Sequence, residues 1–105
     1  MRYHVTVMPS AEEDIVSIIG YISDDLGNRM AASEHYNAFN EALGSLEQMP
    51  DRNPVSGLDV LRQRHIRLLP VRNYVVLYRV FTKERKVEVY RVLYSGMDIE
   101  RRILE

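Results

Sequence analysis

Residues 61–99 read LRQRHIRLLPVRNYVVLYRVFTKERKVEVYRVLYSGMDI and contain three runs rich in valine, isoleucine, leucine and tyrosine. The runs cover residues 64–69, 74–81 and 86–94, and short segments with proline, asparagine and charged residues separate them. Runs of β-branched and aromatic residues between turn-forming residues are typical of strands joined by short turns. This stretch therefore predicts an antiparallel meander of three strands.

Arginines interrupt the apolar pattern of these strands at Arg64, Arg67, Arg79 and Arg91, where threonine or valine would suit a purely structural sheet better. Residues 61–91 carry nine basic and two acidic side chains, whereas residues 11–51 carry nine acidic side chains and one arginine. The chain thus has an acidic half and a basic half, and we expect an acidic group to meet the sheet. The net charge of −1 argues against non-specific adhesion to nucleic acid.

A first strand is predicted over residues 2–8, which alternate and are β-branched, and Pro9 ends it. Ser10 precedes Glu13 by three residues, the spacing of a capping box in which each side chain satisfies a free backbone N–H. We therefore expect a helix that begins at Ala11. Its buried stripe is predicted to contain Ile15, Ile18, Ile19, Ile22 and Leu26.

Gly27 is suited to end this helix in a left-handed conformation, and Asn28 to cap the next one. A second helix is predicted over residues 29–49, closed by Pro50. So short a connection makes the two helices an antiparallel hairpin whose apolar face needs a sheet to cover it. We expect a loop over residues 50–60 and a short terminal helix over 97–104, hence a single α+β domain, residues 1–105, of order β-α-α-β-β-β with a helical hairpin on a small antiparallel sheet.

If the last turn of the meander has two or four residues, facing residues on the last two strands have opposite parity in residue number. Each residue of these strands can then be assigned to one of two faces. One face is then apolar enough to receive the helices, and the other is a partly covered surface. The face toward the helices is predicted to hold Tyr74, Val76, Tyr78, Val80, Val87, Val89, Arg91 and Leu93. The other face is predicted to hold Val75, Leu77, Arg79, Phe81, Glu88, Tyr90, Val92 and Tyr94.

Composition excludes several classes of function. The 105 residues include no cysteine, which removes disulfides, thiolate catalysis and cysteine-ligated metals. The histidines at positions 4, 35 and 65 lack metal-ligand spacing, and no glycine-rich phosphate loop is present, so we expect no metal and no cofactor. No apolar run reaches the roughly 20 residues of a membrane span, so we expect a cytoplasmic protein without membrane contact.

Three segments carry a resemblance that spans almost the whole chain: VTVMPSAEEDIVSIIGYI (5–22), RNYVVLYRV (72–80) and VEVYRVLYSGMDIERRI (87–103). Together with the element order, they resemble the RelE/ParE superfamily of bacterial type II toxins, often labelled plasmid-stabilisation toxins. The last segment is most similar to the ParE branch, whose final strand commonly ends in Arg-Val-Leu-His. Tyr94 occupies the position of that histidine here.

The resemblance implies a cytoplasmic toxin that a cognate antitoxin neutralises in a hetero-oligomer, by wrapping it as helix and strand. ParE-type members poison DNA gyrase by binding. RelE-type members are endoribonucleases that cut mRNA on the ribosome, using basic side chains to stabilise charge on the phosphate. We expect a ParE-like, protein-binding gyrase inhibitor, with a ribosome-dependent endoribonuclease as the alternative. A third alternative is an inactive member that only binds its antitoxin.

The basic pair of RelE-type members falls on His65 and Arg67, but their next arginine falls on Val75 and their later basic residue near Tyr94 and Ser95. A late tyrosine has no match after Gly96. If the chain is a nuclease, the resemblance implies His65, Arg67, Arg72, Arg91 and Tyr94. If it binds a protein target, we expect contacts from Arg67, Arg79, Arg91, Tyr94, Ser95, Met97 and Asp98.

For several of these residues, a purely structural role is the alternative to a functional one. His65 and Arg67 suit a solvated strand face equally well. Arg79 suits a cross-strand ion pair with Glu88, and Tyr94 suits packing at a strand end.

Overall fold

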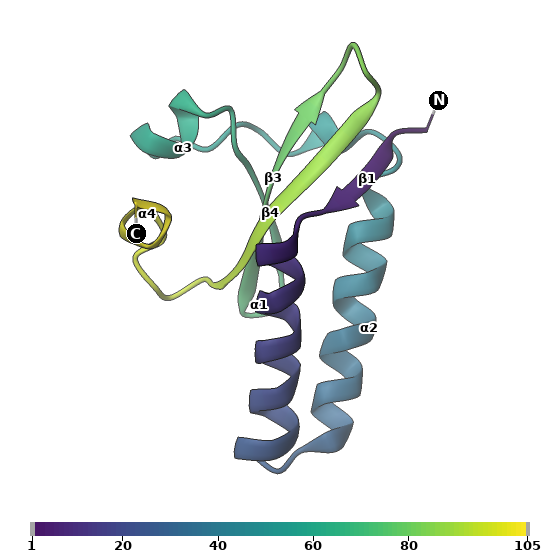
Figure 1. Ribbon diagram of the computed structural model, residues 1–105, viewed down its shortest axis with the longest axis vertical. Coiled ribbons are helices and arrows are strands. Elements are labelled where there is room, and N and C mark those ends of the chain that lie inside the picture. Colours follow the sequence, from purple (N-terminus) through teal and green to yellow (C-terminus); the bar gives the residue numbers. More distant parts are fainter. Residues whose placement is uncertain (1, 105) are drawn as a thin grey trace.

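The computed structural model describes residues 2–104 and places a helical hairpin against one face of a four-stranded sheet (Figure 1). Short helices α3 and α4 lie on the other side of the sheet from the hairpin (Figure 1). The order and class of the elements confirm the predicted α+β fold. The elements are β1 (His4–Val7), α1 (Pro9–Gly20), α2 (Arg29–Ser45), α3 (Asp59–Gln63), β2 (Arg67–Val71), β3 (Tyr74–Phe81), β4 (Lys86–Tyr94) and α4 (Ile99–Leu104).

The first helix starts differently from the prediction. It begins at Pro9 rather than Ala11, with Met8 as its N-cap residue and no side-chain cap, so the expected Ser10–Glu13 capping box is wrong. Proline is favoured at the first helical position because its φ is already helical and its missing N–H needs no partner. A π-helical turn, Tyr21–Asp25, then extends α1.

The hairpin turn agrees with the sequence. Gly27 has a left-handed φ of 62°, and the Asn28 side chain accepts a hydrogen bond from the Ala31 N–H at 3.0 Å, as predicted. α2 ends at Ser45, before the predicted Met49. The Arg52 guanidinium donates to the carbonyl oxygen and Oγ of Ser45, the last residue of α2, and to the carbonyl oxygens of Gln48 and Met49 beyond it.

The segment that precedes the meander is more ordered than the predicted loop. It contains a short 3-10 helix, Pro50–Arg52, and α3, which the buried Leu61 anchors. The Arg64 and His65 N–H groups bond back to α3, and His65 has a left-handed φ of 59°. The next strand therefore starts at Arg67, and the predicted start at Arg64 is wrong.

The sheet has the strand order β1-β4-β3-β2. β2, β3 and β4 form the predicted antiparallel meander. β1 lies parallel to β4, so the complete sheet is mixed, and the prediction of a wholly antiparallel sheet is wrong. β3 and β4 are its interior strands; β2 covers β3 over Tyr74–Tyr78, and β1 covers β4 over Lys86–Val89.

A β-bulge divides the long β3–β4 pair. Leu77 faces Arg91, but the next residue, Tyr78, faces Val89, which leaves Tyr90 as the extra residue. An extra residue in one strand moves every later side chain to the opposite face. Assigning odd and even positions to opposite faces requires continuous pairing. The face assignment from the sequence is therefore wrong beyond the bulge.

Because of the bulge, part of the predicted assignment of residues to the two faces is wrong. Val87 and Val89 share a face with Tyr78 and Val80 as expected, but Arg91 and Leu93 were predicted on the wrong face, as were Val92 and Tyr94. We call the side toward the helices the hairpin face; its core consists of Ala11, Phe39, Leu46, Val71, Val76, Tyr78, Val87, Val89 and Val92. We call the opposite side the second face; its smaller core consists of Leu61, Ile66, Val75, Leu77 and Leu93, with Leu68, Tyr90 and Ile99 packed against it.

Candidate functional site

Arg67 belongs to the hairpin face, where it lies opposite Tyr78. Its guanidinium donates to two backbone carbonyl oxygens, that of Asp51 at 3.2 Å and that of Asn53 at 2.5 Å. These contacts hold the segment that precedes the meander against β2. The Arg67 side chain therefore has a structural role on the helix side of the sheet.

The other two members of the possible nuclease set on this part of the chain are exposed. His65 lies between α3 and β2, and Arg72 lies in the β2–β3 turn with a left-handed φ of 54°. β2 separates them, since the strand occupies Arg67–Val71. They do not converge with Arg67, whose side chain is held by Asp51 and Asn53.

Tyr78 is fully buried beneath the same segment. Its hydroxyl donates to the Pro50 carbonyl oxygen at 2.6 Å and accepts from Asn53 Nδ2 at 3.0 Å. Burial raises the pKa of Tyr78, because the interior disfavours the phenolate. The neutral phenol thus holds the segment from Pro50 to Asn53 by two hydrogen bonds.

Replacing Tyr78 by phenylalanine is expected to lower the free energy of unfolding by about 1–2 kcal/mol, because the Pro50 carbonyl and the Asn53 amide lose a partner. Chemical denaturation of the two proteins measures this difference. Tyr36→Phe, at an exposed hydroxyl on α2, is the matched control and should change stability little. Equal stability of the Tyr78→Phe protein would contradict the assigned role.

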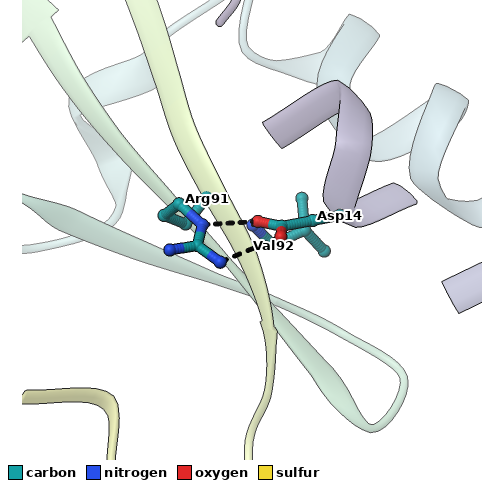
Figure 2. Close-up of polar contacts among 3 residues, drawn as sticks. All are labelled: Asp14, Arg91 and Val92. Carbon is teal, nitrogen blue, oxygen red and sulfur yellow. Dashed lines mark hydrogen bonds and ion pairs between the residues drawn. The ribbon is translucent and has the colours of Figure 1, made fainter. Parts of the chain in front are cut away.

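Arg91 forms an ion pair with Asp14 of α1 (Figure 2). Arg91 Nε and Nη2 donate to the two carboxylate oxygens at 2.7 and 3.0 Å, and the Val92 N–H donates to the same carboxylate at 2.9 Å. The hydrogen bond to Asp14 raises the pKa of Arg91. β1 ends opposite Val89. Beyond that point the Asp14 carboxylate accepts the hydrogen bond of the Val92 N–H, at an edge of β4 that β1 does not cover.

The end of β4 carries four of the expected target contacts. Tyr94, Ser95, Met97 and Asp98 are all exposed. The Tyr94 ring packs edge-on against Tyr74, with centroids 5.9 Å apart. The Ser95 hydroxyl donates to the Asn73 carbonyl oxygen at 2.9 Å, and Asp98 caps α4 by accepting from the Arg101 N–H.

Arg79 lies opposite Glu88 on the second face, but no ion pair joins the two side chains among the described residues. The Arg79 guanidinium instead stacks over the Phe81 ring, 4.6 Å from its centroid. Glu88 pairs with Lys86 at 3.5 Å and accepts a hydrogen bond from the Tyr90 hydroxyl at 2.8 Å. The predicted Arg79–Glu88 pair is therefore wrong, because Glu88 already has partners.

Burial raises the pKa of Tyr90 to about 12, and the hydrogen bond to Glu88 adds to the effect. Because Tyr90 in the unfolded chain ionises near the usual tyrosine pKa of 10.0, the folded state binds the proton more tightly. The stability that Tyr90 contributes should be complete below pH 10 and disappear as the pH rises toward about 12. Tyrosinate absorbance of the folded protein should therefore lose its highest-pH step in Tyr90→Phe; an unchanged titration curve would contradict this assignment.

Arg79 also lines a cavity of about 440 Å³ on the second face. The cavity opens between α3 and the bulged part of β3 and β4. Its wall includes Arg64, which is exposed and which the sequence did not single out as a site residue. The complete lining is Leu61, Gln63, Arg64, Ile66, Leu77, Arg79 and Tyr90.

The expected nuclease residues thus do not form one cluster. Arg67 is held on the hairpin face, Arg91 is paired with Asp14, and Tyr94 lies at the end of β4. The structure brings together Arg79 and Arg64 instead. Asp14 was also missed as the partner of Arg91, because residues so distant in sequence show no local pattern.

No group of three histidine, cysteine, aspartate or glutamate side chains within residues 2–104 is placed to hold a metal ion. In the same range, no helix is long and apolar enough to cross a membrane.

Comparisons with solved structures place the fold among toxin-antitoxin complexes. The chromosomal ParDE system of P. aeruginosa matches with a TM-score of 0.70 and 14% identity, over 89% of this chain and 96% of that chain. The RelBE2 complex of Mycobacterium tuberculosis matches with a TM-score of 0.63 and 17% identity, over 90% and 99%. The archaeal RelE-RelB complex of Pyrococcus horikoshii OT3 matches with a TM-score of 0.55 and 20% identity, over 91% and 98%.

Comparisons of the sequence identify one family. The chain has no match among curated proteins. The family described as the ParE toxin of the type II toxin-antitoxin system, parDE, matches residues 5–99, which contain the hairpin, the sheet and the first residue of α4. The chain therefore belongs to the ParE toxin family of type II toxin-antitoxin systems, within the RelE/ParE superfamily.

Proposed function

We propose that this chain is a toxin that inhibits DNA gyrase by binding it, and that a cognate antitoxin neutralises it by forming a hetero-oligomer. The observation that carries the proposal is the dispersion of the cations. Arg67 is held by backbone carbonyl oxygens and Arg91 by Asp14, so the two side chains do not converge on one site.

Cleavage of RNA by its own 2′-hydroxyl needs an acid, a base and cations that converge on one phosphate. The available cations do not meet this requirement. Arg67 and Arg91 are each bound to oxygen atoms of this chain, on different elements. This dispersion favours a binding toxin over an endoribonuclease.

The hairpin offers a place for the antitoxin. Between α1 and α2 lies a hollow, and Val16 beside it is 72% exposed. The hollow is lined by Ile19, Ser23, Arg29, Ala32, Ser33, Tyr36 and Asn37. An amphipathic helix laid in such a groove would cover these side chains. Of the two edge strands, β2 contains Pro70, which hinders strand addition, so β1 is the better edge for an added antitoxin strand.

The test is a supercoiling assay with purified gyrase and relaxed plasmid, run beside an in vitro translation assay that reveals mRNA cuts. We expect the chain to block supercoiling and to leave mRNA intact. Ribosome-dependent cuts with unaffected supercoiling would overturn the proposal in favour of the nuclease.

The exposed end of β4 gives a second arm to this test. A chain truncated after Gly96 loses Met97 and Asp98, and it should lose gyrase inhibition while circular dichroism still shows the folded hairpin and sheet. Full inhibition by the truncated chain would exclude the C-terminal segment as a target contact.

A further inference from the structure

The cavity beside α3 combines an apolar floor with a charged rim. Leu61 and Leu77 are fully buried and Ile66 is 6% exposed, so packed aliphatic side chains close the bottom of the cavity. The volume of about 440 Å³ lies in the range of pockets that bind small ligands and exceeds what one side chain fills. An apolar group placed there would leave water and contact a packed surface.

The rim carries the guanidinium groups of Arg64 and Arg79, and neither forms an ion pair with a described residue. Arg64 is exposed, and Arg79 stacks on Phe81. Glu88, which lies opposite Arg79 on the neighbouring strand, pairs instead with Lys86 and accepts a hydrogen bond from the Tyr90 hydroxyl. The neighbouring Asp59 pairs with Arg62. Two cations beside an apolar hollow therefore present a site for carboxylates that flank an apolar group.

The position in the sheet limits how a partner can enter. Leu77 and Arg79 lie on β3, and Tyr90 lies on β4, which are the two interior strands. Leu77 is paired on both sides, with Leu68 of β2 and Arg91 of β4, so the backbone at this residue is closed to an added strand. An occupant of the cavity therefore contacts Leu77 through side chains, unlike an antitoxin segment that adds to an edge or fills the hairpin groove.

A nucleic acid fits the cavity less well. The floor offers aliphatic side chains rather than exposed aromatic faces on which bases stack. Tyr90, the one aromatic residue of the lining, is partly buried, and its hydroxyl is bonded to the Glu88 carboxylate. Two arginines also give little of the counterion release that drives phosphate binding.

We propose that this cavity anchors an acidic segment of the toxin's protein target, with an aliphatic side chain beside Ile66 and Tyr90, above the buried Leu61 and Leu77, and carboxylates on Arg64 and Arg79. The assignment rests on the proposed function, since it takes the target to be a protein. It names the chemistry of the target segment: apolar residues flanked by aspartate or glutamate.

The direct test is a titration of the full chain followed by amide chemical shifts. The probe is the blocked peptide Asp-Glu-Leu-Leu-Glu-Asp, and we expect it to shift Ile66, Leu77 and Tyr90. The peptides Asp-Glu-Ser-Ser-Glu-Asp and Lys-Lys-Leu-Leu-Lys-Lys remove the apolar anchor and the negative charge in turn, and each should bind at least about tenfold more weakly. Stronger shifts with a single-stranded RNA hexamer, or none with the first peptide, would overturn the assignment.

Charge reversal identifies the residues. Arg64→Glu and Arg79→Glu should each weaken peptide binding by about tenfold, because each removes one charged contact. Lys83→Glu, in the exposed β3–β4 turn, makes the same change of charge outside the cavity and should bind as the unchanged chain does. If Arg79→Glu is unstable through loss of its stacking on Phe81, Arg64→Glu still decides the outcome, since its side chain is exposed. Equal effects of all three variants would contradict the site.

The gyrase assay separates this inference from the function on which it rests. If the unchanged chain inhibits gyrase and the Arg64→Glu and Arg79→Glu chains inhibit it equally well, the cavity is not the target contact, although the function stands. If the unchanged chain does not inhibit gyrase, the function fails, and the assignment of the cavity to this target fails with it. Loss of inhibition in the two cavity variants, with inhibition kept in Lys83→Glu, is the expected result.

Discussion

Replacing Phe39 by alanine is expected to lower the free energy of unfolding by about 4 kcal/mol. Phe39 is fully buried at the centre of the contact between α2 and the hairpin face, and its ring packs edge-on against Tyr74 at 5.7 Å. The substitution removes this apolar contact and leaves a cavity that a packed sheet cannot close. The hairpin should therefore detach at much lower denaturant concentration.

Urea unfolding followed by circular dichroism measures this loss. Asn40→Ala changes the next residue, which is exposed on the same helix, and should alter stability by less than about 0.5 kcal/mol. Similar midpoints for the two variants would mean that Phe39 does not hold the hairpin to the sheet.

Replacing Asp14 by alanine is expected to cost about 3 kcal/mol, the second-largest effect. The carboxylate is 16% exposed and serves three donors, two on Arg91 and one at Val92 N–H (Figure 2). Its removal leaves a largely buried guanidinium and a strand-edge N–H without their acceptor. The contact between α1 and the end of β4 should loosen first.

The neighbouring Glu13 supplies the control for this change, because Glu13→Ala removes an exposed acid from the same turn and should be nearly neutral. Asp14→Asn keeps an acceptor for the Val92 N–H and should fall between the two. Faster hydrogen exchange at Val92 in Asp14→Ala would locate the loss. An unchanged unfolding midpoint would show that the ion pair contributes only as a surface pair does.

The sequence predicted the element order because each signal was local. Gly27 and Asn28 end one helix and cap the next, and both do so in the structure. The runs from Tyr74 to Phe81 and from Lys86 to Tyr94 became β3 and β4 with the predicted bounds. Short-range chemistry of this kind needs no knowledge of tertiary contacts.

The faces of β4 were predicted only up to the bulge. Tyr90 lies in a run of alternating residues that gives no sign of an extra residue. What favours the bulge is tertiary: Tyr90 reaches the second core and Glu88, while Val92 stays in the core beneath the hairpin. The prediction from alternating positions therefore placed Arg91 and Val92 each on the wrong face of the sheet.

The candidate site was limited in the same way. Basic residues on the strands were visible in the sequence, but their partners were not. Arg67 is bound by backbone carbonyl oxygens and Arg91 by Asp14 on a distant helix, whereas Arg64 and Arg79 meet only because α3 folds over the second face. The sequence indicated which charges were present, and only the fold distinguishes the engaged cations from those beside the cavity.

Inducing the chain alone in bacteria, with a DNA-damage reporter and a reporter mRNA followed in the same cells, tests the central claim most directly. A gyrase-binding toxin should raise the DNA-damage signal while the mRNA remains intact. Codon-phased cuts in the mRNA without DNA damage would contradict the claim and return attention to His65, Arg67 and Arg72. Neither response from a folded protein would also contradict it and would favour an inactive partner of the antitoxin.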